Sequence, residues 1–296
     1  MTSGKKAAAP PRTNGKKSLS FESSSPTNKK PAKGIKRDFH AIGSKVTGAT
    51  HLRQESGCQD ALYVSPAGRD FAIACVADGH GSSACPHSAD GAKAAVALAG
   101  ELLESILDDI SAHKDIWLPK QIETKWKEAV RAVHEETERE ITDPFPYVQY
   151  GTTLLALAAW GGFVFVLQIG DGNILMIDSK GNSRPILDTE RVGEDTESLC
   201  LEDAWKYIRT QIIPLDPEEE AYMFMISTDG YANSFADGAG FIKAGADYFN
   251  LWREEGLSVI EGELEGWLRK SSDKGSGDDI ALALVVAENK GAKRGK

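Results

Sequence analysis

The chain has 296 residues, 41% of them hydrophobic, and a formal net charge of −10. This composition provides apolar material for one large core or two modest ones. The charge is uneven, because residues 1–37 hold ten Lys or Arg against one Glu and carry +9, which leaves −19 on the rest. An acidic remainder argues against a large basic surface for nucleic acid on the folded part.

Residues 1–37 are rich in Ser, Pro, Gly and Lys and contain almost no large apolar side chain. Such a segment cannot offset its ordering entropy, so we predict a disordered basic tail over 1–37. A folded domain over 38–290 and a short basic tail over 291–296 follow. The N-terminal tail could bind nucleic acid, an anionic membrane or an acidic partner, but a solvated tether is the favoured interpretation.

Two features bear on the compartment. No continuous apolar stretch follows Lys5-Lys6, as a secretory signal would require. The chain's cysteines have no CxxC spacing, which argues against a disulfide framework or a zinc site. We therefore expect reduced thiols in a cytoplasmic protein. The four cysteines are Cys58, Cys75, Cys85 and Cys200.

The first predicted elements are two strands and two helices. Residues 39–46 alternate as an edge strand would, and the apolar run FAIACVA at 71–77 indicates a buried strand. A helix is predicted over 86–110, and Pro119 can stand in the first turn of a second helix. The apolar stripe of that second helix is expected to comprise Ile122, Trp126, Val130, Val133, Thr137 and Ile141.

Residues 151–169 contain no charge and are long enough to cross a bilayer. The Gly161-Gly162 pair instead favours a hairpin of two buried strands. Further strands are predicted near 172–178, 222–228 and 280–287. Hairpin-linked strands with helices grouped between them indicate the α+β class with antiparallel sheets in one domain.

Four apolar strands each have an aspartate at one end. Any one Asp-Gly pair is most simply a turn, but four carboxylates together need water, a cation or each other, because an unpaired buried carboxylate costs several kcal/mol. No Lys or Arg stands beside them, and carboxylates without His or Cys clusters suit magnesium, manganese or calcium. These residues are Asp78, Asp171, Asp229 and Asp278.

Six motifs occur in the order and approximate spacing of metal-dependent Ser/Thr phosphatases of the 2C type, and the chain most resembles their compact bacterial members. They are ESGCQDA at 55–61, VADGHG at 76–81, YGTT at 150–153, IGDG at 169–172, STDG at 227–230 and GDDIALALVV at 277–286. The resemblance covers roughly residues 38–288. It implies a four-layer sandwich of two antiparallel sheets flanked by helices.

The resemblance also implies roles for individual residues. Asp78 would bridge two divalent cations, Mn²⁺ or Mg²⁺, with the Gly79 carbonyl as a further ligand. A hydroxide between the cations would then attack phosphorus in line. His80 would protonate the leaving oxygen. The other implied metal residues are Asp229 and Asp278 on the first ion, Asp60 on the second through water, and Asp171 with Asp229 on a third, weaker ion.

The chain departs from the family pattern around the expected phosphate-binding arginine. Glu55 stands at that position, and Arg53 is the nearest replacement, although an exposed loop charge is an equally good interpretation. His51 nearby is interpreted as a loop histidine. Gln59 and Asp279 stand where Glu and Asn are usual. A further departure is Asn173 after IGDG, without the arginine often found near it.

Three functions remain open from the sequence. The favoured one is a phosphoprotein phosphatase acting on phosphoserine and phosphothreonine proteins, with a cognate Ser/Thr kinase as an expected partner. The others are a pseudophosphatase that binds phosphoproteins without turnover, and a hydrolase of small phosphate esters. Residues 186–215 lie where relatives carry a variable flap beside the active site, and substrate selection is expected there.

Overall fold

A computed structural model describes residues 36–137, 142–187 and 197–290. The tails predicted over 1–37 and 291–296 lie almost wholly outside these residues, and the boundaries of the domain stay predictions. The first described strand, β1, begins at Arg37.

Two antiparallel five-stranded sheets form the centre of the domain. The first sheet has the order β1-β10-β9-β6-β7, so β1 is an edge strand, as predicted. The second has the order β2-β3-β4-β5-β8. The strands are β1 (Arg37–Val46), β2 (Ala61–Val64), β3 (Phe71–Ala77), β4 (Leu154–Trp160), β5 (Phe163–Ile169), β6 (Asn173–Ile177), β7 (Ser183–Pro185), β8 (Arg209–Pro214), β9 (Ala221–Ser227) and β10 (Ile280–Asn289).

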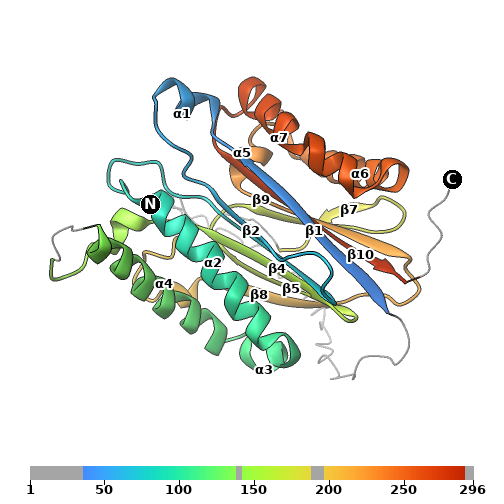
Figure 1. Cartoon of the computed structure of the whole chain (residues 1–296), viewed down its shortest axis with the longest axis horizontal. Coiled ribbons are helices and arrows are strands. Elements are labelled where there is room, and N and C mark those ends of the chain that lie inside the picture. The colour runs from blue at the N-terminus through green and yellow to red at the C-terminus, as the bar shows by residue number, and fades with distance from the viewer. Residues whose placement is uncertain (1–35, 138–141, 188–196, 291–296) are drawn as a thin grey trace, which may run out of the picture. The chain divides into compact units, whose positions relative to one another are not determined.

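Helices cover the outer face of each sheet, as Figure 1 shows, with α2 and α4 on one side and α6 and α7 on the other. One apolar core lies between the sheets and one lies under each helical layer. The expected four-layer α+β sandwich is therefore confirmed. The helices are α1 (Ala49–Arg53), α2 (Ser88–Ile106), α3 (Ile110–His113), α4 (Trp117–Glu136), α5 (Asp229–Ala232), α6 (Gly238–Glu255) and α7 (Leu257–Lys274).

The uncharged run at 151–169 forms the predicted hairpin of β4 and β5. Trp160 pairs with Phe163 across the turn, and Gly161 adopts a φ of 54°, which glycine accepts without a steric cost. Within the described residues, no helix is both long and apolar enough to cross a membrane.

The two predicted helices need correction at their ends. The first is shorter than 86–110, because α2 ends at Ile106 and a 3-10 turn and α3 follow. In α4 the last buried residue of the stripe is His134, whereas Thr137 is exposed. The His134 Nδ1 lies 3.0 Å from the hydroxyl of Tyr150, whereas the Thr137 hydroxyl donates back to the Val133 carbonyl at the helix end. Ile141 lies outside the described residues.

Part of the segment predicted as a flap belongs to a sheet. Residues Arg209–Pro214 form β8, which pairs with β5 from Gln168↔Arg209 to Phe163↔Pro214. This edge strand, RTQIIP, has three polar residues in a row followed by two adjacent isoleucines. It therefore lacks the alternation of polar and apolar residues from which a half-buried strand is predicted. The flap can therefore extend no further than residue 208.

Candidate active site

The aspartates predicted from separate strands meet at one end of the sandwich. Antiparallel pairing brings the end of β3 beside the start of β2, through Ala77↔Ala61, and the end of β9 beside the start of β10, through Ser227↔Leu282. The residues just outside these strand ends therefore converge from both sheets. They are Asp60 before β2, Asp78 after β3, Asp171 after β5, Asp229 after β9 and Asp278 before β10.

A cleft of about 370 Å³ opens at this end of the domain. Six of the eight predicted site residues line it, and two others, Asp60 and Arg53, do not. Its lining comprises His51, Gln59, Asp78, Gly79, His80, Gly81, Ser82, Asp171, Asp229 and Asp278.

Asp60 lies beneath the cleft, with 2% of its surface exposed. Burial raises its pKa well above the usual 3.8, and the carboxylates of Asp279, Asp278 and Asp229 act in the same direction. The Thr228 hydroxyl opposes this rise by donating a hydrogen bond of 2.7 Å to Asp60 Oδ2. A carboxylate buried among others is costly to ionise unless a cation is near.

Two carboxyl groups on the cleft wall, those of Asp78 and Asp229, also have raised pKa values. Burial raises the pKa of Asp78 well above 3.8, and Asp60 and Asp229 are the next largest causes. Burial also raises the pKa of Asp229, followed by the charges of Asp171 and Asp278. A hydrogen-bonding effect of the Asp78 side chain acts against that rise.

Backbone and hydroxyl contacts to β4 fix the loop that follows β3. The Asp78 amide donates to Thr153 Oγ1, and the Asp78 carbonyl accepts from the Thr153 amide and the Thr152 hydroxyl, each at 2.9 Å. The His80 amide donates to the Gly151 carbonyl at 3.0 Å. Thr152 and Thr153 therefore bind the backbone of this loop, and the side chains of Asp78 and His80 line the cleft.

His80 is half-buried in the cleft wall. Burial lowers the pKa of its imidazole below 6.5, and the charge of Asp171 opposes this change. A histidine with a lowered pKa is a stronger acid when protonated, and the nearby carboxylate favours the protonated form. These two effects suit a group that gives a proton to a departing oxygen.

The residues at this cleft fit divalent cations bound through oxygen. The Gln59 Oε1 is buried and has no hydrogen-bond partner within the described part of the chain. It adds a neutral oxygen to the carboxylates, the ligand type that magnesium and manganese prefer. No three His, Cys, Asp or Glu side chains of the described residues stand close enough to ligate one ion together.

The structure separates Arg53 from this cleft. Its side chain is exposed and donates to Thr50 Oγ1 at 3.0 Å. His51, interpreted from the sequence as a loop histidine, lines the cleft instead. Asp279 accepts hydrogen bonds from the amides of Gly48, at 2.6 Å, and Gln59, at 2.7 Å. No local sequence pattern indicates these two contacts, which join segments 220 or more residues apart.

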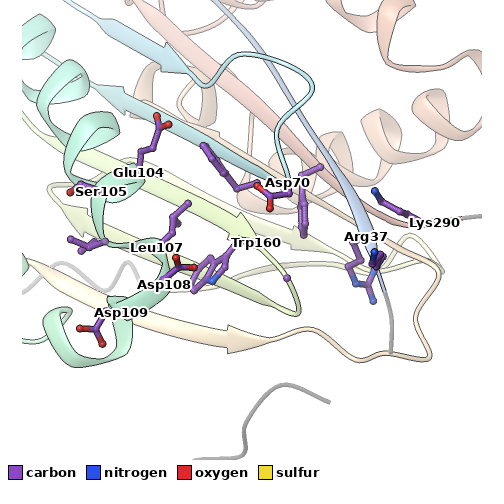
Figure 2. A pocket seen from close by; sticks show the side chains of 14 residues that line it. Arg37, Asp70, Glu104, Ser105, Leu107, Asp108, Asp109, Trp160 and Lys290 are labelled. Carbon is purple, nitrogen blue, oxygen red and sulfur yellow. The ribbon is translucent and has the colours of Figure 1, made fainter. Parts of the chain in front are cut away.

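A larger hollow, of about 680 Å³, lies at the opposite end of the sandwich. Figure 2 shows that Trp160, at the end of β4, and Lys290 line it. Its described lining has no histidine, and its acidic side chains, Asp70, Glu104, Asp108 and Asp109, stand among the basic ones of Lys36, Arg37 and Lys290. The chemistry described above therefore belongs to the smaller cleft.

Comparison with known proteins identifies the family. The model of the family "Protein phosphatase 2C" matches residues 47–269, most of the chain. Among curated proteins, none matches this sequence.

Solved structures agree in fold. PppA of Pseudomonas aeruginosa, described as a key regulatory component of its T6SS, is 17% identical with a TM-score of 0.54, over 86% of this chain and 100% of that one. The S. agalactiae serine/threonine phosphatase is 17% identical with a TM-score of 0.55, over 83% and 98%. The catalytic domain of the phosphatase PstP, solved with two manganese ions, is 16% identical with a TM-score of 0.52, over 86% and 99%.

At such identities these likenesses show the fold alone, whereas the family match rests on the sequence. The matched segment includes the ends of β3 and β9, where Asp78 and Asp229 meet. The chain therefore belongs to the protein phosphatase 2C family and is a metal-dependent serine/threonine protein phosphatase.

Proposed function

We propose that the cleft at the end of the sandwich is the active site and that its carboxylates hold two divalent cations, Mn²⁺ or Mg²⁺. The observation that carries this proposal is the convergence of acids from both sheets with raised pKa values at Asp60, Asp78 and Asp229. The proposed metal residues are Asp60, Asp78, Gly79, Asp229 and Asp278, with Asp171 near a third, weaker ion.

Each protein group has a stated part in phosphoester hydrolysis. Bound cations supply a nucleophile from water at neutral pH and neutralise the phosphoryl oxygens. Asp78 and Asp229, each of which affects the pKa of the other, supply negative charge that would hold the cations. His80 donates a proton to the serine or threonine oxygen as it leaves. The hydroxyls of Thr152 and Thr153 keep the loop of Asp78 and His80 in place.

The test is phosphate release from a phosphothreonine peptide with manganese, with magnesium, and with excess chelator. We expect turnover with either metal and none with chelator. Equal turnover in chelator would contradict the metal mechanism. A pseudophosphatase would bind the peptide without release, and a small-ester hydrolase would have a higher kcat/KM for a small alkyl phosphate than for the peptide.

Two features of the biological setting are also proposed. The chain is expected in the cytoplasm, supported by four cysteines that are free thiols among the described residues. A Ser/Thr kinase that phosphorylates the same substrates is the expected partner. Cell fractionation tests the cytoplasmic location. Higher phosphorylation of the substrates after deletion of the phosphatase gene tests whether a kinase acts on them.

A further inference from the structure

His51 and Asp279 form a pair at the rim of the active-site cleft. The His51 Nδ1 lies 3.0 Å from Asp279 Oδ1, and Asp279 is 3% exposed. The amides of Gly48 and Gln59 donate to the two carboxylate oxygens, so the carboxylate is fixed by two backbone groups. One nitrogen of the His51 imidazole stands beside this carboxylate at ion-pair distance, outside hydrogen-bond geometry.

The other nitrogen of the ring faces the cleft. The His51 Nε2 is 3.7 Å from the point where a side chain on Gly81 would begin, so it lies over the loop that carries Asp78 and His80. His51 is 18% exposed and is itself part of the cleft lining. His51 therefore lines the same cleft as Asp78, beside Gly81.

The lining of the cleft is mostly acidic, so a hydrogen-bond donor such as His51 Nε2 is scarce in it. Four carboxylates line the cleft, and no Lys or Arg is among its described lining residues. His51 and His80 are thus the two lining side chains able to carry a positive charge. A phosphoryl group is a dianion, and it needs a donor besides the cations to orient its oxygens. Arg53 is exposed, is not part of the cleft lining, and donates to Thr50 instead.

We propose that His51, positioned by Asp279, donates a hydrogen bond from Nε2 to a phosphoryl oxygen of the bound substrate. In the complex the ring lies between the Asp279 carboxylate and a phosphoryl oxygen, with the Nε2 hydrogen directed at the phosphoryl oxygen. The inference rests on the proposed active site, and it gives His51 the function that the sequence led us to seek in Arg53.

The identity of residue 279 agrees with this arrangement. Two donors, the amides of Gly48 and Gln59, reach its side chain, and His51 Nδ1 lies 3.0 Å from one of its oxygens. Both oxygens of an aspartate can accept from the two amides. An asparagine would turn its NH₂ group toward one of these donors and leave two hydrogens facing each other. The aspartate, where Asn is usual, therefore fits the two backbone amides.

The test compares His51→Ala, His51→Gln, Arg53→Ala and the surface control His40→Ala in the full chain with manganese. We measure kcat and KM for a phosphothreonine peptide and the inhibition constant of inorganic phosphate. His51→Ala is expected to raise KM and the phosphate inhibition constant about 10-fold or more, the size of one charge-assisted hydrogen bond. His51→Gln, which keeps a donor without the charge, should raise them less, and Arg53→Ala less than either.

Manganese affinity, measured by calorimetry without substrate, separates contact with phosphate from damage to the metal site. It should be unchanged in His51→Ala. An unaltered phosphate inhibition constant in His51→Ala and His51→Gln would overturn the inference while leaving the proposed function intact, and so would a larger effect in Arg53→Ala. Absence of metal-dependent turnover in the wild type would instead contradict the proposed function, and calorimetric binding of phosphate would then still test His51.

Discussion

Thr228 donates its hydroxyl hydrogen to Asp60 across 2.7 Å, and this contact joins the two sheets at the active-site end. Thr228 follows β9 in the first sheet, and Asp60 precedes β2 in the second. The same hydroxyl oxygen accepts from the Ala281 amide at 2.9 Å. It therefore stabilises the ionised form of a buried carboxylate and satisfies a buried backbone group of β10.

Thr228→Val should lower both stability and metal affinity. It keeps the shape of the side chain but leaves the Ala281 amide and the Asp60 carboxylate without this partner, which costs about 1–3 kcal/mol per buried group. The melting temperature and the manganese dissociation constant measure the two effects. Thr228→Ser, which keeps the hydroxyl, is the matched control and should stay close to wild type on both. Equal behaviour of the two variants would show that the hydroxyl is not needed.

Asp78→Asn should stabilise the metal-free protein while weakening its response to metal. In excess chelator at neutral pH, the wild type carries a buried charge among other carboxylates, and Asn removes it. We expect a higher melting temperature for the variant in chelator and a smaller rise on adding manganese. Asp108→Asn, an exposed change, is the control for both measurements. A lower melting temperature of Asp78→Asn in chelator would contradict the electrostatic argument.

The stability difference between the wild type and Asp78→Asn depends on pH, and the raised pKa of Asp78 gives the direction of the change. The pKa of Asp78 is raised in the fold, so its contribution to stability is complete below the unfolded pKa near 3.9 and is lost as pH rises through the folded pKa. The difference between wild type and Asp78→Asn in chelator should therefore narrow as the pH is lowered from about 7.5 to 5. A difference that widens on acidification would mean that the folded pKa is not raised.

Gly79→Ala should be more harmful than Gly81→Ala, although the two glycines flank the same histidine. A Cβ on Gly79 would lie 2.8 Å from the Gln59 carbonyl oxygen and the Ser88 carbonyl carbon, which are backbone atoms that cannot move alone. On Gly81 it would lie 2.9 Å from Gln59 Oε1, the end of a flexible side chain.

We expect Gly79→Ala to cost about 1–3 kcal/mol of unfolding free energy, as overpacking does, and Gly81→Ala less. Denaturant unfolding in chelator measures this difference without any contribution from bound metal. Turnover of a phosphopeptide should fall in the same order. If Gly81→Ala proved the more destabilising, the loop would not pack against residues 59 and 88 as described.

The sequence predicts the strands that are apolar on both faces and the alternating edge strand β1, and misses the short or weakly alternating strands β2, β7 and β8. Residues 71–77 are buried on both sides, and β3 has the predicted bounds, whereas β8 lies at a sheet edge and alternates weakly. The aspartates could be found because each follows or precedes such a run. His51 could not, because its position depends on Asp279, a contact across 228 residues that no local pattern encodes.

His80→Ala tests the proposed general acid through the choice of leaving group. An alkoxide from serine or threonine leaves only with a proton, whereas a nitrophenolate leaves almost unaided. The variant should therefore lose phosphopeptide turnover by a factor of about 10² or more, the range typical of general acids, and lose much less on nitrophenyl phosphate. Both substrates are assayed at saturating manganese, so that a change in metal affinity does not enter. Equal losses on the two substrates would make His80 a residue that positions the metal site, and no loss on either would reduce the Asp78-Gly79-His80-Gly81 loop to a turn at the end of a buried strand.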